Sequence, residues 1–425
     1  MKQHRILIFS SATLLVLLLY ACISTTKVSV QNIADMYRSD YQYLHPQFRI
    51  YQAGDSSSIL YYKLNEDELL YIRRNEQDSF YASVRVVCLV TAAYESSVVL
   101  DSNSVSLRVS SITNTKKDFA IGALPIKLNV NQSYLVTVKT TDMISKKEAI
   151  TYLPAENTNG MGGRNFLVKN NADGRVLFPD YIDSAANLSV TFNKPVQKLT
   201  VYYYHRNFPL AAPPFSNIAH TPFKFNPDSS FTLTKGSHNT FNLKAGPKGI
   251  YHIMADTAGH SGLTIYRLNP HFPDIDVAGQ MVHPLRYITS NEEYRLLTGA
   301  KDVKKAVDNF WLNIAGNSKE RARALIRIYY NRVQQANNYF TSYLEGWKTD
   351  RGMIYIIYGP PSVVYRSSTG ESWTYGEDRN FMSLVFTFEK VNNPFSDNDY
   401  ELQRSPLFRD EWYNQVDVWR QGRVY

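Results

Sequence analysis

The sequence predicts a multidomain, mainly β protein with two antiparallel β-sandwich-like domains, followed by a mixed helix–sheet domain. Segments in which apolar and polar residues alternate recur through the first two thirds of the chain, as in half-buried strands. From about residue 283 the apolar residues recur at three- and four-residue steps, which is the period of a helix packed on one face. The 425 residues also exceed what one hydrophobic core usually supports.

Residues 1–21 have the features of a cleaved export signal. A basic start with Lys2 and Arg5 precedes a short apolar run that ends at Ala21. The run is too short to span a bilayer, and Cys22 follows it as in a bacterial lipoprotein signal. We therefore expect the mature chain to begin at Cys22, with palmitate on that residue, and to be anchored in the outer membrane. The alternatives are a secretory signal cut elsewhere and an uncleaved anchor.

The composition agrees with a folded, exported protein. It is 44% hydrophobic and 13% aromatic, and disorder would require fewer aromatic residues and more net charge. The formal charge of +8 is scattered in basic pairs rather than in one run, which indicates a solvated surface. Attraction to anionic lipid is the alternative interpretation, and nucleic acid is not an expected partner of an exported chain.

Residues 22–152 are expected to form the first β-sandwich-like domain. Alternating segments occur at residues 80–90, 105–109 and 134–138, with polar turn clusters between them. The alternation places Cys88 on the buried face of a strand, where it is an inert core residue. With Cys22 lipidated, Cys88 has no second cysteine to pair with, so no disulfide is expected.

A glycine-rich stretch within residues 153–163 interrupts the pattern and is expected to be a linker. Residues 164–282 again contain alternating segments and predict a second β-sandwich-like domain. The proline-rich segment 208–215 cannot be a central strand, because proline donates no ladder hydrogen bond. It is either a packed connection between strands or, because of its apolar content, a docking segment.

Residues 283–390 are expected to form the helix–sheet domain. A capping box at Ser290 opens a helix that continues to Trp311, with an interruption near Gly299. A second helix, capped at Asn317 or Ser318, carries an apolar stripe that ends near residue 340.

A strand is then expected at residues 353–358, which form an apolar run before Gly359. The remaining residues, 391–425, form an aromatic-rich tail. In this tail Trp412, Val416 and Trp419 lie at helical steps, so the tail is expected to pack on its own domain or on a partner.

Residues 346–352, Gly-Trp-Lys-Thr-Asp-Arg-Gly, stand between the second helix and the expected strand. Here the chain resembles the GWxTD domain family of exported proteins, found chiefly in Bacteroidota. The resemblance spans about residues 285–380. It implies an exported lipoprotein but no activity, because the family is named for its motif. In Bacteroidota lipoproteins, surface export resembles a process that reads acidic residues after the lipidated cysteine. Residues 23–27 contain none, which favours the periplasmic face.

The motif has two interpretations. As a structural turn, it uses Gly346 and a second glycine at residue 352 for a tight, positive-φ backbone, and Trp347 as a packing anchor. Thr349 and Asp350 then hydrogen-bond to turn amides.

As a binding site, the motif offers Trp347, Asp350 and Arg351 as candidate binding residues, with Trp347 as a platform and Arg351 as the group that reads an anionic ligand. In the structural interpretation Asp350 and Arg351 form an ion pair, and removal of Arg351 is expected to alter folding little.

The sequence contains no catalytic or metal-binding motif, so neither a cofactor nor a metal is expected. We expect a non-enzymatic binding or scaffold component of an envelope complex that assembles or secretes outer-membrane proteins. Its expected partners are outer-membrane or periplasmic proteins. The alternatives are a carbohydrate- or peptidoglycan-binding lipoprotein, with a glycan as partner, and a hydrolase with a site near Asp350.

Overall fold

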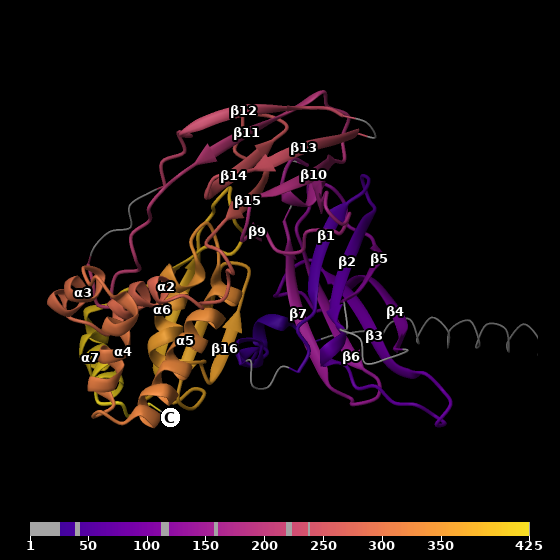
Figure 1. Ribbon diagram of the computed structural model, residues 1–425. Helices are drawn as coiled ribbons and strands as arrows, with labels where there is room; N and C mark the ends of the chain where they lie inside the picture. The colour runs from indigo at the N-terminus through magenta and orange to yellow at the C-terminus, as the bar shows by residue number, and fades with distance from the viewer. Residues whose placement is uncertain are drawn as a thin grey trace, which may run out of the picture.

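The computed structural model is mainly β, with a C-terminal region of helices and one sheet (Figure 1), as the sequence predicts. The expected signal and Cys22 lie outside the residues that the structure describes, which are 26–38, 43–111, 119–156, 160–217, 223–236 and 239–424.

The first β region consists of two antiparallel sheets that enclose one apolar core. Within it, strand β3 alternates between buried and partly exposed residues, and Cys88 lies fully buried between Val86 and Val90. The prediction for Cys88 is therefore confirmed. The first sheet is β1 (Gln47–Gln52), β2 (Ser58–Asn65) and β5 (Phe119–Ile126), and the second is β4 (Val99–Ser111), β3 (Phe80–Thr91), β6 (Tyr134–Asp142) and β7 (Glu148–Ala155).

The second β region also has two sheets around its own core. The join between the two regions is packed: the buried Arg164 side chain donates hydrogen bonds to the carbonyls of Ala155 and Asn129, both at 2.8 Å. One sheet contains β8 (Phe166–Asn170), β10 (Ala186–Phe192) and β13 (Thr240–Ala245). The other contains β9 (Tyr181–Ile182), β11 (Lys198–Tyr204), β12 (Ser229–Thr234), β14 (Gly249–Met254) and β15 (Leu263–Arg267).

The chain between β11 and β12 leaves the second β region and descends to the helices (Figure 1). We call residues 207–217 of this connection the connecting arm. The arm packs against the C-terminal region through ring contacts at its two ends, Phe208 with Tyr343 and Phe215 with Tyr413. The proline-rich segment is thus a packed connection.

The helices of the C-terminal region begin and end at the signals in the sequence. Ser290 and Glu293 form the expected capping box, and Gly299 ends the helix that Ser290 opens. Ser318 caps the long helix. The helical elements up to the motif are α2 (Ala278–Val282), the 3₁₀ helix η6 (His283–Tyr287), α3 (Asn291–Thr298), α4 (Val303–Ile314), α5 (Lys319–Phe340) and the 3₁₀ helix η7 (Gly346–Lys348).

The expected strand at residues 353–358 is wrong, because these residues belong to helix α6 (Asp350–Tyr358). The helix starts at Thr349, whose hydroxyl accepts a hydrogen bond from the Gly352 backbone N–H at 3.0 Å. Residues Met353 to Ile357 are all at most 1% exposed. A helix that is buried on every side has no amphipathic period, so a short apolar run of this kind cannot be distinguished from a buried strand.

Helix α6 packs against α5 and against strand β19 of a four-stranded sheet, as well as against the C-terminal helix. The buried Trp412 and Trp419 lie on that C-terminal helix, so the apolar stripe of the tail packs on its own domain. The sheet contains β16 (Val363–Arg366), β17 (Gly370–Tyr375), β18 (Leu384–Lys390) and β19 (Tyr400–Leu402), and the last elements are η8 (Pro406–Phe408) and α7 (Arg409–Arg420).

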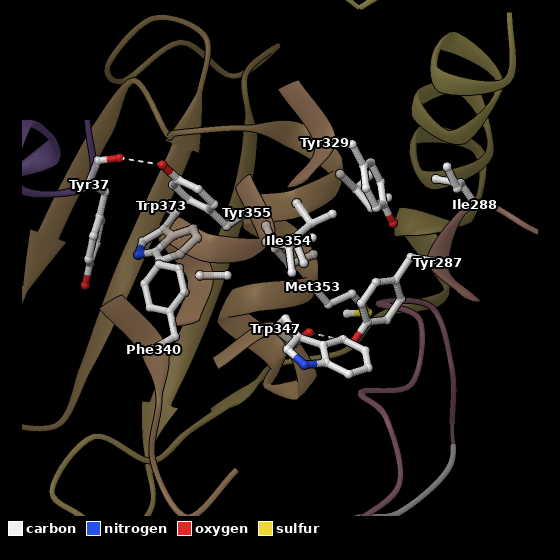
Figure 2. Close-up of a cluster of buried hydrophobic side chains, with 14 of the residues drawn as sticks. Tyr37, Tyr287, Ile288, Tyr329, Phe340, Trp347, Met353, Ile354, Tyr355 and Trp373 are labelled. Atoms are coloured by element: carbon white, nitrogen blue, oxygen red, sulfur yellow. Dashed lines mark hydrogen bonds between the residues drawn. The ribbon is translucent and has the colours of Figure 1, made fainter. Parts of the chain in front are cut away.

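The N-terminal segment 28–37 also packs into this C-terminal core. It contains the 3₁₀ helices η1 (Val28–Val30) and η2 (Ala34–Tyr37). The Ile33 N–H donates to the Val364 carbonyl at 2.9 Å, beside strand β16. Tyr37 is 2% exposed, and its carbonyl accepts a hydrogen bond from the Tyr355 hydroxyl at 2.8 Å (Figure 2). The C-terminal core is therefore completed by residues from the start of the chain.

Candidate functional site

The motif tryptophan joins three elements. Trp347 is 6% exposed, and its backbone N–H donates to the Asn337 side chain of α5 at 3.2 Å. Its carbonyl accepts a hydrogen bond from the Tyr287 hydroxyl of η6 at 2.9 Å, and the two rings meet edge to face (Figure 2). Trp347 is therefore a packing anchor with only a small exposed edge.

The motif glycines are required by close packing rather than by positive φ. A Cβ atom on Gly346 would lie 1.9 Å from the Ala336 carbonyl oxygen of α5. A Cβ atom on Gly352 would lie 1.9 Å from the carbonyl oxygen of Gly346. Neither glycine has a positive φ, so the positive-φ turn expected from the sequence is wrong. The glycines allow η7 to lie directly against α5 and α6.

Asp350 and Arg351 do not pair with each other. One Asp350 oxygen accepts the Leu402 backbone N–H at 2.8 Å, and the other pairs with Arg404. Arg351 is 1% exposed and pairs with Glu371 at 3.0 Å. The expected ion pair is therefore wrong. Arg351 lies in the core, away from any surface ligand, and its burial does not fit the expectation that its removal leaves folding unchanged.

A groove of about 1240 Å³ lies beside the motif. The connecting arm lines it together with the segment that runs from residue 269 through α2 and η6, and with residues of α7. Trp347 and Lys348 of the motif line the same space. The backbone N–H of Ala211 in the arm donates to the Lys348 carbonyl at 3.1 Å, so the arm is bound directly to the motif backbone.

The charged part of the groove centres on Glu345, whose side chain is 5% exposed. Its carboxylate accepts a hydrogen bond from the Asn269 side chain at 2.8 Å and pairs with Lys348. Lys248 lies 3.9 Å from the same carboxylate, and its pKa is lowered by burial and by nearby Lys348, against the opposing effect of Glu345. Burial and the neighbouring lysines also lower the pKa of His283.

The family model of the GWxTD domain matches residues 249–421. The match begins at β14, whereas the resemblance was expected to start at about residue 285. It ends just after the last residue of α7. Below, the part of this match from α2 to α7, residues 278–420, is called the GWxTD region. No curated protein matches the chain.

Among solved structures, the chain is similar to one described as "Biofilm associated protein - BSP domain", with 8% identity and a TM-score of 0.16. The likeness covers 55% of this chain and 53% of that chain, so the chain spans about half the length of this structure.

The interior of the GWxTD region holds a buried charge cluster that the sequence did not reveal. Glu371 is 2% exposed and contacts Arg351 at 3.0 Å and Arg366 at 3.2 Å. It also accepts hydrogen bonds from the Tyr37 hydroxyl and from the Trp373 ring N–H. Burial opposes ionisation of Glu371, but the two arginines and these hydrogen bonds outweigh it, so its pKa is lowered. The cluster links the motif to the N-terminal segment.

The groove residues Lys248, Asn269 and His283 were also missed, since they lie far from the motif in sequence. The apolar content of the proline-rich segment was the one signal that pointed to this place.

In the part of the chain that the structure describes, no group of three His, Cys, Asp or Glu residues is arranged to hold a metal ion. Over the same residues, none of the helices has the length and apolar character needed to cross a membrane.

Proposed function

We propose that the protein is an outer-membrane lipoprotein, anchored through Cys22, that binds another envelope protein through the groove beside the GWxTD motif. In this role it is a binding or scaffold component of a complex that assembles or secretes outer-membrane proteins. The observation that carries the proposal is the groove itself, where the connecting arm, η6 and α7 meet over the motif.

The groove has the dimensions and surface of a protein-binding site. Its volume of about 1240 Å³ is above the range of about 300–1,000 Å³ typical of small-molecule pockets. Val277 and Tyr413, which line it, are each 50% exposed. Apolar side chains that remain exposed beside a concave surface favour a protein partner.

A photo-crosslinking amino acid at position 413 tests this function in intact envelopes. We expect a discrete protein adduct from position 413, and none from position 100, because Leu100 is an equally exposed apolar residue (54%) on the first β region. The adduct should disappear in Val277→Asp, which places a charge in the groove. Adducts of equal yield from both positions, or none from either, would show that the groove is not the binding surface.

The anchor is tested separately by Cys22→Ser. This change should leave unprocessed precursor or a soluble form in place of the membrane-bound, lipid-modified protein. Unchanged membrane fractionation and mass would refute the lipoprotein assignment. Protease protection of the wild-type protein in intact cells would support the periplasmic face.

A glycan is the second candidate partner, because the half-exposed ring of Tyr413 offers a stacking face in the groove. Binding of purified peptidoglycan fragments that is lost in Tyr413→Ala would favour it. The hydrolase alternative has no such support, since both oxygens of Asp350 are engaged by Leu402 and Arg404.

A further inference from the structure

The charged end of the groove carries more positive than negative charge. The ammonium groups of Lys248 and Lys348 face the single carboxylate of Glu345. Lys248 is held by one hydrogen bond of 2.7 Å to Asn269, and its side chain is 47% exposed. An ammonium group has three donors, so Lys248 can accept a further anionic partner without losing its place.

The arrangement of these groups suits a carboxylate. Glu345 accepts a hydrogen bond from Asn269 and pairs with Lys348, and Asn269 in turn accepts a hydrogen bond from Lys248, so both ammonium groups are held at the edge of the groove. A ligand carboxylate beside Lys248 would form a charge-assisted hydrogen bond and would balance the local charge. Partial burial of Lys248 strengthens such a contact relative to one in bulk water.

Two other acidic residues, Asp274 and Asp417, also line the groove. Asp417 lies on α7, and its backbone carbonyl accepts the Gln421 N–H at 2.9 Å. Neither carboxylate lies within ion-pair distance of Lys248. The ion pair of Lys248 is with Glu345.

Apolar surface continues from the charged end along the groove. Leu210 of the arm, Val277 before α2, and Tyr413 and Val416 of α7 line it, with Val277 and Tyr413 half exposed. A ligand that fills the groove therefore needs apolar groups beside its carboxylate.

The connecting arm shows that the motif backbone can hold a peptide segment beside the groove. The backbone N–H of Ala211 is hydrogen-bonded to the motif, as described above. The Pro214 carbonyl accepts a hydrogen bond at 3.0 Å from the N–H of Ser405, which follows strand β19. The Arg404 side chain donates to the Ala212 carbonyl at 3.3 Å. A segment outside any helix or strand is therefore already held on one side of the groove by hydrogen bonds to its backbone.

From these observations we infer that the groove selects a linear peptide segment of a partner protein, with an acidic side chain next to apolar residues. The inference rests on the proposed function and states the chemistry of the partner. Lys248 contacts the acidic side chain, and the surface from Leu210 to Tyr413 takes the apolar residues.

Selection from a displayed library of random linear heptapeptides, against the full mature chain, tests the inference. Selected peptides should be enriched in Asp or Glu next to apolar residues. Synthetic, capped versions should lose about tenfold or more in affinity when the acid is changed to its amide. The double variant Lys248→Gln/Lys348→Gln should show the same loss and a flatter dependence of affinity on salt.

Lys304→Gln is the matched control, because Lys304 lies on α4 with 77% of its side chain exposed, outside the groove lining. It should bind like the wild type, and Lys248→Arg should retain most of the affinity. An unchanged melting temperature establishes that the double variant is folded.

The outcomes separate the two proposals. Groove-binding peptides with no acidic residue, or binding that is insensitive to the lysine substitutions, would overturn this inference and leave the proposed function standing. Failure to select any peptide whose binding is abolished by Val277→Asp would overturn this inference, while crosslinking from position 413 decides the proposed function separately.

Discussion

The first β region and the GWxTD region build their cores in opposite ways. The core of the first β region comes from residues 44–155, and its strands pair largely with neighbours in the chain. The core of the GWxTD region includes residues 28–37, the connecting arm and the tail up to residue 424. The first is therefore a local structure, whereas the second forms only when distant parts of the chain meet.

The two cores also differ in how they hold buried charge. The first β region buries the Asp142 carboxylate, which accepts hydrogen bonds from the backbone N–H groups of Leu70 and Ile144, both at 2.9 Å. The GWxTD region buries Glu371 with Arg351 and Arg366. Such a cluster adds little net stability when it is complete, but loss of one member leaves an uncompensated buried charge.

The largest expected effect in the comparison comes from Arg351→Met. This change leaves the Glu371 carboxylate with half of its charge compensation, and we expect the free energy of unfolding of the GWxTD region to fall by about 4 kcal/mol. Denaturant titration followed by tryptophan fluorescence measures it, because all five tryptophans lie at residue 311 or later.

Two further variants control this experiment. Arg351→Met combined with Glu371→Gln should recover part of the loss, since the uncompensated charge is removed. Arg108→Met, on strand β4 of the first β region, should leave the fluorescence transition unchanged. An Arg351→Met protein as stable as the wild type would show that the cluster is solvated in solution.

The contribution of the N-terminal segment is tested by Tyr37→Ala. Tyr37 packs its ring on Phe340 and Trp373, with centroids 5.1 and 5.3 Å away. We expect a loss of about 3 kcal/mol in the same transition, because a large buried ring is removed. Tyr37→Phe should lose about 1–2 kcal/mol, through the hydrogen bonds to Glu371. If the alanine variant is unchanged, the N-terminal segment is not part of this core.

The same difference explains what the sequence could predict. Cys88 in β3 and the capping box at Ser290 were predicted correctly, because alternation and capping are local patterns. The helix α6 was taken for a strand because every side of it is buried. Arg351 was expected to pair with Asp350 or, in the alternative, to bind an anionic ligand, because its partner, Glu371, is 20 residues away on another element. Long-range pairing of this kind leaves no mark in one sequence.

A smaller effect on stability is expected from the protonation of His252. This residue lies where the second β region meets the GWxTD loop that carries Phe395, and the centroids of the two rings are 5.1 Å apart. Burial lowers the pKa of His252 to about 4, and its two ring nitrogens contact the Thr264 hydroxyl and the His260 carbonyl, both at 2.9 Å. The folded state therefore holds His252 neutral below pH 6.5, where the unfolded chain takes up a proton.

Neutral His252 should thus make its full contribution to the free energy of unfolding above pH 6.5. This contribution should decrease by on the order of 2 kcal/mol as the pH falls towards 4. The measurement is the free energy of unfolding against pH for the wild type and His252→Gln. The difference between the two curves should change over this interval. Parallel curves would show that His252 has an ordinary pKa in the folded protein.

The smallest expected effect is the decisive one for the comparison. In a Cys22→Ser background Cys88 is the only thiol, and burial raises its pKa to about 12. Alkylation of Cys88 therefore requires the first β region to open, while tryptophan fluorescence reports only on the GWxTD region. Native protein should resist labelling.

Arg351→Met should leave the rate of Cys88 labelling within about a factor of two of wild type, because the first β region has its own core. If labelling instead accelerates in step with the loss of GWxTD stability, the two regions unfold as one cooperative unit. The packed contacts between them, such as the Glu95 carboxylate with the Ser368 hydroxyl at 2.7 Å, would then transmit the destabilisation.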